Sequence, residues 1–120
     1  MIHVHSGETP WTERPGYSKK PLVTGDQIGA PGTLVQLLRI RPGEVADSHF
    51  HKGCTEVFYF PGEAGEWTVN GQKVHIQTGD VLVIQPGDHH TVRNSGTEDV
   101  VYIAFKVNVV EDDYFESKQA

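Results

Sequence analysis

Hydrophobic residues gather in short runs separated by Pro-Gly pairs, and they do not follow the spacing of a helix face. The pairs lie at 15–16, 31–32, 42–43, 61–62 and 86–87. Proline presets φ for a turn and glycine adopts positive φ at little cost, so each pair indicates a turn. The runs between them are rich in β-branched and aromatic residues and predict strands: TLVQLLRI (33–40), EVFYF (56–60), EWTVN (66–70), KVHIQ (73–77), DVLVIQ (80–85), HTVRN (90–94) and DVVYIAFKVNVV (99–110).

Asn70-Gly71 is the strongest hairpin signal, because a two-residue type I′ turn needs positive φ at both positions. A turn there sets Trp67 opposite Val74. No stretch of ten or more residues holds a helical period. Short strands joined by glycine-rich turns predict an all-β sandwich or barrel.

The 120 residues suffice for one domain with one core. The first 20 residues are predicted to form an irregular N-terminal arm, and 21–110 a single barrel domain. The tail 111–120 is acidic, and we expect it to be frayed or a short terminal helix.

The formal net charge is −6, and no cluster of Lys and Arg stands out. This argues against nucleic acid or an anionic membrane as the main partner. Cys54 is the only cysteine, so no internal disulfide can form, which suits a reducing cytoplasm. The first 20 residues hold no apolar leader and no run approaches 18 apolar residues, so a cytoplasmic protein is expected.

A group of potential metal ligands lies in HFHKGCTE (49–56). On a strand, His49 and His51 share a face, with Cα atoms roughly 6.5 to 7 Å apart. A turn pivoting at Gly53 would return the carboxylate of Glu56 to the same point. Such histidine pairs also occur on solvated strands, and a fourth ligand has to come from elsewhere, with His89 and His90 as candidates.

The residues around this group resemble the first motif of the cupin superfamily. In that motif a glycine, five residues and H-x-H are followed by three or four residues, a glutamate and a later glycine. Here Gly43 precedes His49 and His51, and Glu56 precedes Gly62. Gly62 comes one residue earlier than in the family, which we expect to affect only a turn.

A second cupin motif follows, in which a glycine and five residues lead to P-x-G, a histidine and an asparagine. Here these are Gly79, the turn 85–87, His90 and Asn94. Gln85 replaces the first proline of the turn, while Pro86 still rigidifies it.

The resemblance implies a double-stranded β-helix, the jelly-roll or RmlC-like barrel, with His49, His51, Glu56 and His90 around one divalent metal ion. The chemistry of these side chains agrees. Three neutral imidazoles and one carboxylate suit Fe, Mn, Ni, Co or Zn and leave positions open for water or substrate.

Parity along the strands predicts the walls of a substrate pocket. Barrel interiors take alternate residues, so Phe58 and Phe60 share a face with Glu56, while Val92 and Asn94 share one with His90. The resemblance also brings the flanking strands near the metal. On these, Gln36, Tyr102, Ala104 and Lys106 are candidates, with the alternative that they face solvent.

Other residues with reactive or charged side chains receive simpler interpretations. Cys54 is either a sulfur near the metal or, as we prefer, a small turn residue. His89 is expected to face away from His90, either behind the ligands or on the surface. Arg39 and Arg41 have the opposite parity to Gln36 and are expected on the surface or at an interface. The histidines with no completing neighbours are expected in solvent: His3, His5 and His75.

Two functions fit this pattern. The first is a metal-dependent enzyme acting on a small organic molecule by dioxygenase, decarboxylase or isomerase chemistry, with Glu56 as a base and Tyr102 as a proton carrier. The second is a non-catalytic module that binds or senses a small molecule. Apolar runs such as VVYIAFKV are too hydrophobic for one exposed face, and with the resemblance they predict a homodimer.

Overall fold

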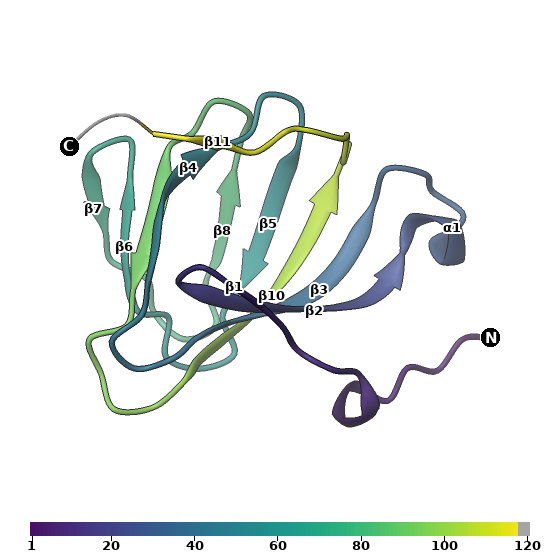
Figure 1. Ribbon diagram of the computed structural model, residues 1–120, viewed down its shortest axis with the longest axis horizontal. Coiled ribbons are helices and arrows are strands. Elements are labelled where there is room, and N and C mark those ends of the chain that lie inside the picture. Colours follow the sequence, from purple (N-terminus) through teal and green to yellow (C-terminus); the bar gives the residue numbers. More distant parts are fainter. Residues whose placement is uncertain (118–120) are drawn as a thin grey trace.

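Two antiparallel sheets face each other in the computed structural model, which describes residues 1–117 (Figure 1). The first sheet contains, in order, β1 (Thr12–Arg14), β2 (Tyr17–Thr24), β3 (Leu34–Ile40), β10 (Val100–Val107), β5 (Thr55–Tyr59) and β8 (Val81–Ile84). The second contains β11 (Phe115–Glu116), β4 (Val45–Phe50), β9 (His90–Arg93), β6 (Glu66–Val69) and β7 (Gln72–Val74).

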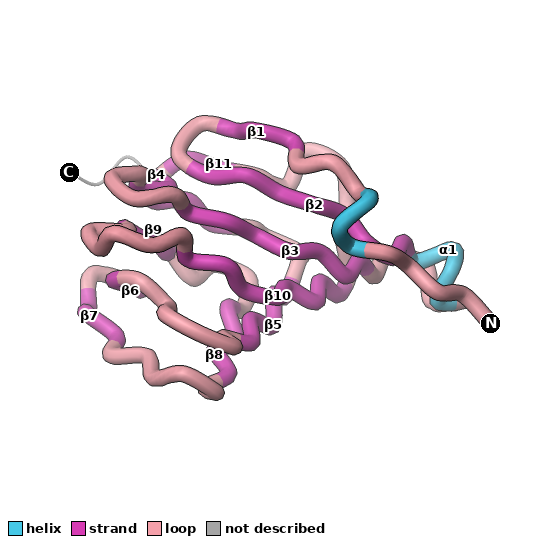
Figure 2. Tube along the Cα trace, turned by 90° about the horizontal axis from the view of Figure 1, so that it is seen from below, coloured by secondary structure: helices cyan, strands magenta, loops and turns pink. Residues whose placement is uncertain are grey.

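The all-β prediction is confirmed, and the arrangement is the jelly-roll of a double-stranded β-helix. Helical structure in the described residues is limited to a 3₁₀ turn (Ser6–Glu8) and the short α1 (Gly25–Ile28). Figure 2 shows both in cyan at the end of the molecule away from β4, β9 and β6. In residues 1–117, helices are too short and too polar to cross a membrane.

The predicted hairpin between β6 and β7 is also confirmed. Trp67 pairs with Val74 across the two strands. Asn70 and Gly71 have φ of 50° and 79°, as the type I′ turn requires. The turn therefore sets the register that directs Trp67 into the core.

Aromatic side chains from both sheets form the centre of the core. The ring of Tyr102 on β10 lies 5.2 Å from Phe58, 5.3 Å from Phe60 and 5.5 Å from Trp67, measured between centroids. The indole N–H of Trp67 donates to the carbonyl of Ala64 at 2.7 Å, so its polar group is satisfied inside the core. This cluster joins the sheets and forms a firm base for the site.

The N-terminal arm predicted over 1–20 is only partly irregular, because β1 and the start of β2 extend the first sheet. Ser18 pairs with Arg39, and both Ser18 and Lys20 are buried. The ammonium of Lys20 donates to the carbonyl of Ser6 at 2.8 Å and lies over the ring of Trp11. The strand was missed because polar residues occupy its buried positions, so it lacks a hydrophobic alternation.

The tail is neither frayed nor helical over residues 111–117. It crosses from the end of β10 to the second sheet, where Phe115 of β11 pairs with Phe50 of β4 (Figure 1). Asn108 and Asp112 turn the chain with φ of 60° and 55°. Part of that prediction, residues 118–120, lies outside the described residues. We call residues 109–117 the C-terminal segment.

Candidate metal centre

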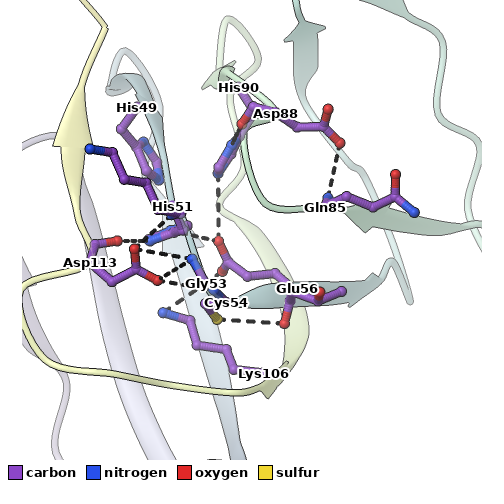
Figure 3. Close-up of polar contacts among 12 residues, drawn as sticks. His49, His51, Gly53, Cys54, Glu56, Gln85, Asp88, His90, Lys106 and Asp113 are labelled. Atoms are coloured by element: carbon purple, nitrogen blue, oxygen red, sulfur yellow. Dashed lines mark hydrogen bonds and ion pairs between the residues drawn. The ribbon is translucent and has the colours of Figure 1, made fainter.

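Four side chains converge between the sheets at the end of the barrel that the C-terminal segment crosses (Figure 3). His49 lies in β4 and pairs in register with His90, the first residue of β9. His51 directly follows β4, and Glu56 is the second residue of β5. One nitrogen or oxygen atom from each lies within 4.8 Å of the others. The side chains predicted as ligands are therefore close enough to share one ion.

Backbone carbonyls orient all three imidazoles. A carbonyl only accepts hydrogen bonds, so each Nδ1 donates and each Nε2 is left to point a lone pair at the common centre. The pairs are His49 Nδ1 with the carbonyl of Asp47 at 2.9 Å, His90 Nδ1 with that of Asp88 at 3.1 Å, and His51 Nδ1 with that of Asp113.

Glu56 carries an incompletely satisfied oxygen in this centre. Its Oε1 is buried and has no hydrogen-bond partner of acceptable geometry, although Nε2 of His51 lies 2.9 Å away and Nε2 of His90 3.7 Å. The ammonium of Lys106 lies 3.8 Å from Oε2. Burial alone would raise the pKa of Glu56, but His51, Lys106 and His90 lower it to about 2. The carboxylate is thus ionised and fits a cation among the imidazoles.

The histidines differ in how readily they take up a proton. Burial, followed by the neighbouring His90, lowers the pKa of His49 to about 4. Burial also lowers the pKa of His90, despite Glu56. For His51 burial acts in the same direction, but close contact with Glu56 and the carbonyl of Asp113 outweigh it and raise the pKa. At neutral pH at least two of the imidazoles are uncharged, as metal ligation requires.

The loop between His51 and Glu56 is held by the C-terminal segment. The carboxylate of Asp113 accepts from the backbone N–H groups of Lys52 at 2.6 Å, Gly53 at 3.0 Å and Cys54 at 3.0 Å. The ring of Tyr114 stacks on His49, with centroids 4.6 Å apart and planes 17° apart. The sequence analysis missed both residues because the tail carries no motif and lies some 60 residues away.

A cavity of about 330 Å³ opens beside the four ligands. Of the predicted pocket residues, those on its wall are Gln36, Phe58, Val92 and Tyr102. Lys106 also lines it, while Asn94 is buried and donates to the carbonyl of Ile40 at 2.8 Å.

Phe60 and Ala104 were predicted to line this pocket, but both are fully buried and neither reaches the cavity. Phe60 lies on the same face as Glu56 but four residues further along, where it packs into the aromatic core. Ala104 pairs with Gln36 on one side and Phe58 on the other, and these longer side chains reach the cavity in its place. Parity gave the correct face but not the depth along the barrel.

Cys54 and His89 lie outside the four-ligand group. The Sγ of Cys54 is directed toward the carbonyl of Thr55 at 3.5 Å, and burial raises the pKa of the thiol. His89 stacks on Phe50, and its Nδ1 lies 2.6 Å from the hydroxyl of Ser117. His89 therefore faces away from His90, as expected.

The remaining charged residues follow the parity argument. Arg39 lies over the ring of Trp11 at 4.4 Å, and Arg41 pairs with Glu13 at 2.9 Å. The histidines expected in solvent are all exposed: His3, His5 and His75.

The family model described as Cupin domain matches residues 36–106, which include all four candidate ligands. The chain belongs to the cupin family. Among curated proteins it is similar to an oxalate-binding protein of Thermotoga maritima, with 31% identity over 83 residues that cover 69% of each chain.

Solved structures share the fold at low identity. A crystal structure of a predicted oxalate decarboxylase from Thermotoga maritima has a TM-score of 0.80 and 22% identity, and the match covers 90% of this chain and all of that one. The structure of Streptomyces PAC13 with uridine has a TM-score of 0.76 and 13% identity, covering 98% and 92%. At these identities the structures support the fold alone.

Proposed function

We propose that the protein holds one divalent metal ion, of Fe, Mn, Ni, Co or Zn, with His49, His51, Glu56 and His90, and acts on a small organic molecule in the adjacent cavity. The observation that carries this proposal is the buried, ionised Oε1 of Glu56, which lacks a hydrogen-bond partner and faces three oriented imidazole nitrogens. Three nitrogen donors and one carboxylate suit these ions.

Such an ion would act as a Lewis acid on a substrate oxygen. The chain's own side chains then bind and orient the substrate. The amide of Gln36 is a donor and an acceptor on the cavity wall, while Leu38 and Phe58 exclude water from it. This division of roles fits decarboxylase or isomerase chemistry, and dioxygenase chemistry is equally compatible with the donor set.

Tyr102 is the candidate proton carrier. Its side chain lines the cavity, and burial, followed by the charge of Glu56, raises the pKa of its hydroxyl well above the ordinary value. The hydroxyl therefore stays protonated at neutral pH and releases its proton only to a strong base, such as an enolate or carbanion. Glu56, with a pKa of about 2, remains a carboxylate and supplies the basic group of the site.

A non-catalytic role in small-molecule binding is the second candidate. The curated relative named an oxalate-binding protein supports it. This role needs the metal and the cavity but not Tyr102. The two functions therefore differ in whether Tyr102→Phe abolishes turnover or leaves ligand binding as the only property of the site.

The test is elemental analysis of protein purified without chelator, then anaerobic reconstitution with each ion and assay for O₂ uptake and for turnover of organic acids. We expect one bound ion per chain and its loss in Glu56→Ala and His90→Ala. His75→Ala, which removes an exposed histidine, is the matched control. Failure of the wild-type protein to bind any of these ions at neutral pH would contradict the proposal.

We also propose a homodimer formed through the outer face of the first sheet. Large apolar side chains are exposed there on neighbouring strands β10, β5 and β8: Phe105, Val107, Tyr59, Val81 and Val83. A contiguous apolar face is typical of an interface. The cytoplasmic location stays a prediction from the sequence.

A further inference from the structure

Three of the chain's ten basic residues line the cavity beside the candidate metal centre. They are Arg14 of β1, Lys19 of β2 and Lys106 of β10. The cavity wall carries two carboxylates, Glu56 in the ligand group and Asp113, whose oxygens accept from three backbone N–H groups. Basic groups therefore outnumber carboxylates here, although the protein as a whole has a net charge of −6.

Strand register directs two of these side chains inward. Lys19 pairs with Leu38, a cavity residue, and Lys106 pairs with both Leu34 and Glu56. Burial, followed by the charges of Arg14 and Lys106, lowers the pKa of Lys19. Within residues 1–117, no ion pair involves Arg14 or Lys19. The three cations thus repel one another, and two of them lack an acidic partner.

The hairpin that carries Arg14 is fixed against the second sheet. Gly16, at its turn, has a φ of 80°, and a Cβ atom there would lie 2.0 Å from the carbonyl oxygen of Val45 at the start of β4. Glu13 beside Arg14 pairs with Arg41 at 2.9 Å. The basic side chains are therefore carried by a supported wall of the cavity.

We propose that Arg14, Lys19 and Lys106 form an anion-binding rim, and that the ligand of the site is an organic acid with a second anionic oxygen group beyond the one held at the metal. This rests on the proposed function, since the metal would hold the first group. The rim lies outside the four-ligand group, so it selects an anion longer than one that only chelates the ion. A carboxylate or a phosphate could occupy it, since both present anionic oxygens to lysine and arginine.

The test compares ligands that differ only in the distal group. Calorimetry on the Co²⁺-loaded protein would measure binding of 2-oxoglutarate and 2-oxopentanoate, which have the same chain length with and without a distal carboxylate. We expect 2-oxoglutarate to bind roughly tenfold more tightly, the effect of one charged hydrogen bond. The difference should shrink as salt is added. A second pair, 3-phosphoglycerate and glycerate, distinguishes a distal phosphate from a distal carboxylate.

Variants connect this preference to the rim. Lys19→Gln and Arg14→Gln should each remove most of the preference for 2-oxoglutarate while leaving 2-oxopentanoate binding and Co²⁺ affinity unchanged. Lys73→Gln, on an exposed position of β7, is the matched control and should retain the preference.

The outcomes separate this inference from the proposed function. Tight Co²⁺ binding with no preference for either distal anion, or a preference that survives Lys19→Gln and Arg14→Gln, would overturn the rim and leave the metal site standing. If Co²⁺ does not bind, the proposed function fails. NMR titration of the metal-free protein with glutarate and pentanoate then tests the rim by itself, and equal binding of the two would overturn it.

Discussion

The backbone carbonyl of Asp113 accepts a hydrogen bond from Nδ1 of His51, although 62 residues separate the two in the chain. The side chain of Asp113 meanwhile accepts from the N–H groups of Lys52, Gly53 and Cys54. One residue of the C-terminal segment thus orients a candidate ligand and also holds the loop that leads to Glu56. Metal affinity should therefore depend on a residue that ligates nothing.

Asp113→Ala removes the acceptor of three backbone N–H groups while keeping the backbone carbonyl. We expect metal affinity to fall at least tenfold, as is typical when a group that supports metal ligands is lost. Asp113→Asn keeps one acceptor oxygen and should fall between the two. Competition with a chromophoric chelator gives the dissociation constants, and Glu111→Ala, at an exposed position of the same segment, is the control. Equal affinity in Asp113→Ala and wild type would show that the loop keeps its shape unaided.

Metal affinity should rise with pH. The pKa of His51 is raised above its ordinary value of 6.5, so below that raised pKa an ion has to displace a proton from His51. His49, with a pKa of about 4, and Glu56, at about 2, are already deprotonated at neutral pH. The apparent affinity should therefore increase through the His51 pKa and level off above it. Calorimetry in two buffers of different ionisation enthalpy should show release of about one proton below that pKa, and a flat profile from pH 6 to 9 would contradict the assignment.

The metal-free protein should lose stability as it is acidified. The pKa of His49 falls from 6.5 to about 4 on folding, so between these values the unfolded chain binds more protons than the native state. Stability then decreases toward low pH by at most about 1.4 kcal/mol per pH unit for this group. His90 acts in the same direction, whereas His51, whose pKa is raised, stabilises the fold below pH 6.5 and loses that contribution as the pH rises through its folded value.

Urea unfolding of chelator-treated protein at pH 7, 6 and 5 measures this dependence. His49→Gln keeps a polar side chain of similar length but cannot titrate, so its midpoint should change less with pH than that of the wild type. A slope that is unchanged in His49→Gln would assign the acid sensitivity to other groups.

The ligand cluster could be predicted from the sequence because its geometry is local. Parity places His49 and His51 on one face, and a single turn returns Glu56 to them. Asp113 and Lys19 could not be predicted in the same way. Asp113 acts through contacts some 60 residues away, and Lys19 belongs to a strand whose buried positions are polar. Phe60 shows the third limit, since alternation specifies a face of the barrel but not a depth within it.

Gly16→Ala should destabilise the β1–β2 hairpin. The added methyl group would meet the carbonyl oxygen of Val45 at 2.0 Å, and the residue has a φ of 80°, which L-amino acids rarely adopt. We expect a loss of about 1–3 kcal/mol of unfolding free energy. Thermal unfolding measures it, with Gly7→Ala as the control, since a Cβ atom at Gly7 meets nothing within 4 Å. An unchanged midpoint in Gly16→Ala would show that the turn can move off Val45.

Val83→Lys tests the proposed dimer interface. Val83 is 47% exposed on β8 and pairs with Val57 of β5, so its side chain lies in the apolar outer face of the first sheet. A lysine there keeps the strand solvated in a monomer but places a charge against the apolar surface of a partner, where its desolvation is costly. We expect the wild type to have the mass of a dimer in light scattering at micromolar concentration, and Val83→Lys that of a monomer with its strand content intact. Lys73→Glu, on the exposed edge strand β7 of the other sheet, should leave the mass unchanged. A wild-type monomer, or a dimer that survives Val83→Lys, would exclude this face as the interface.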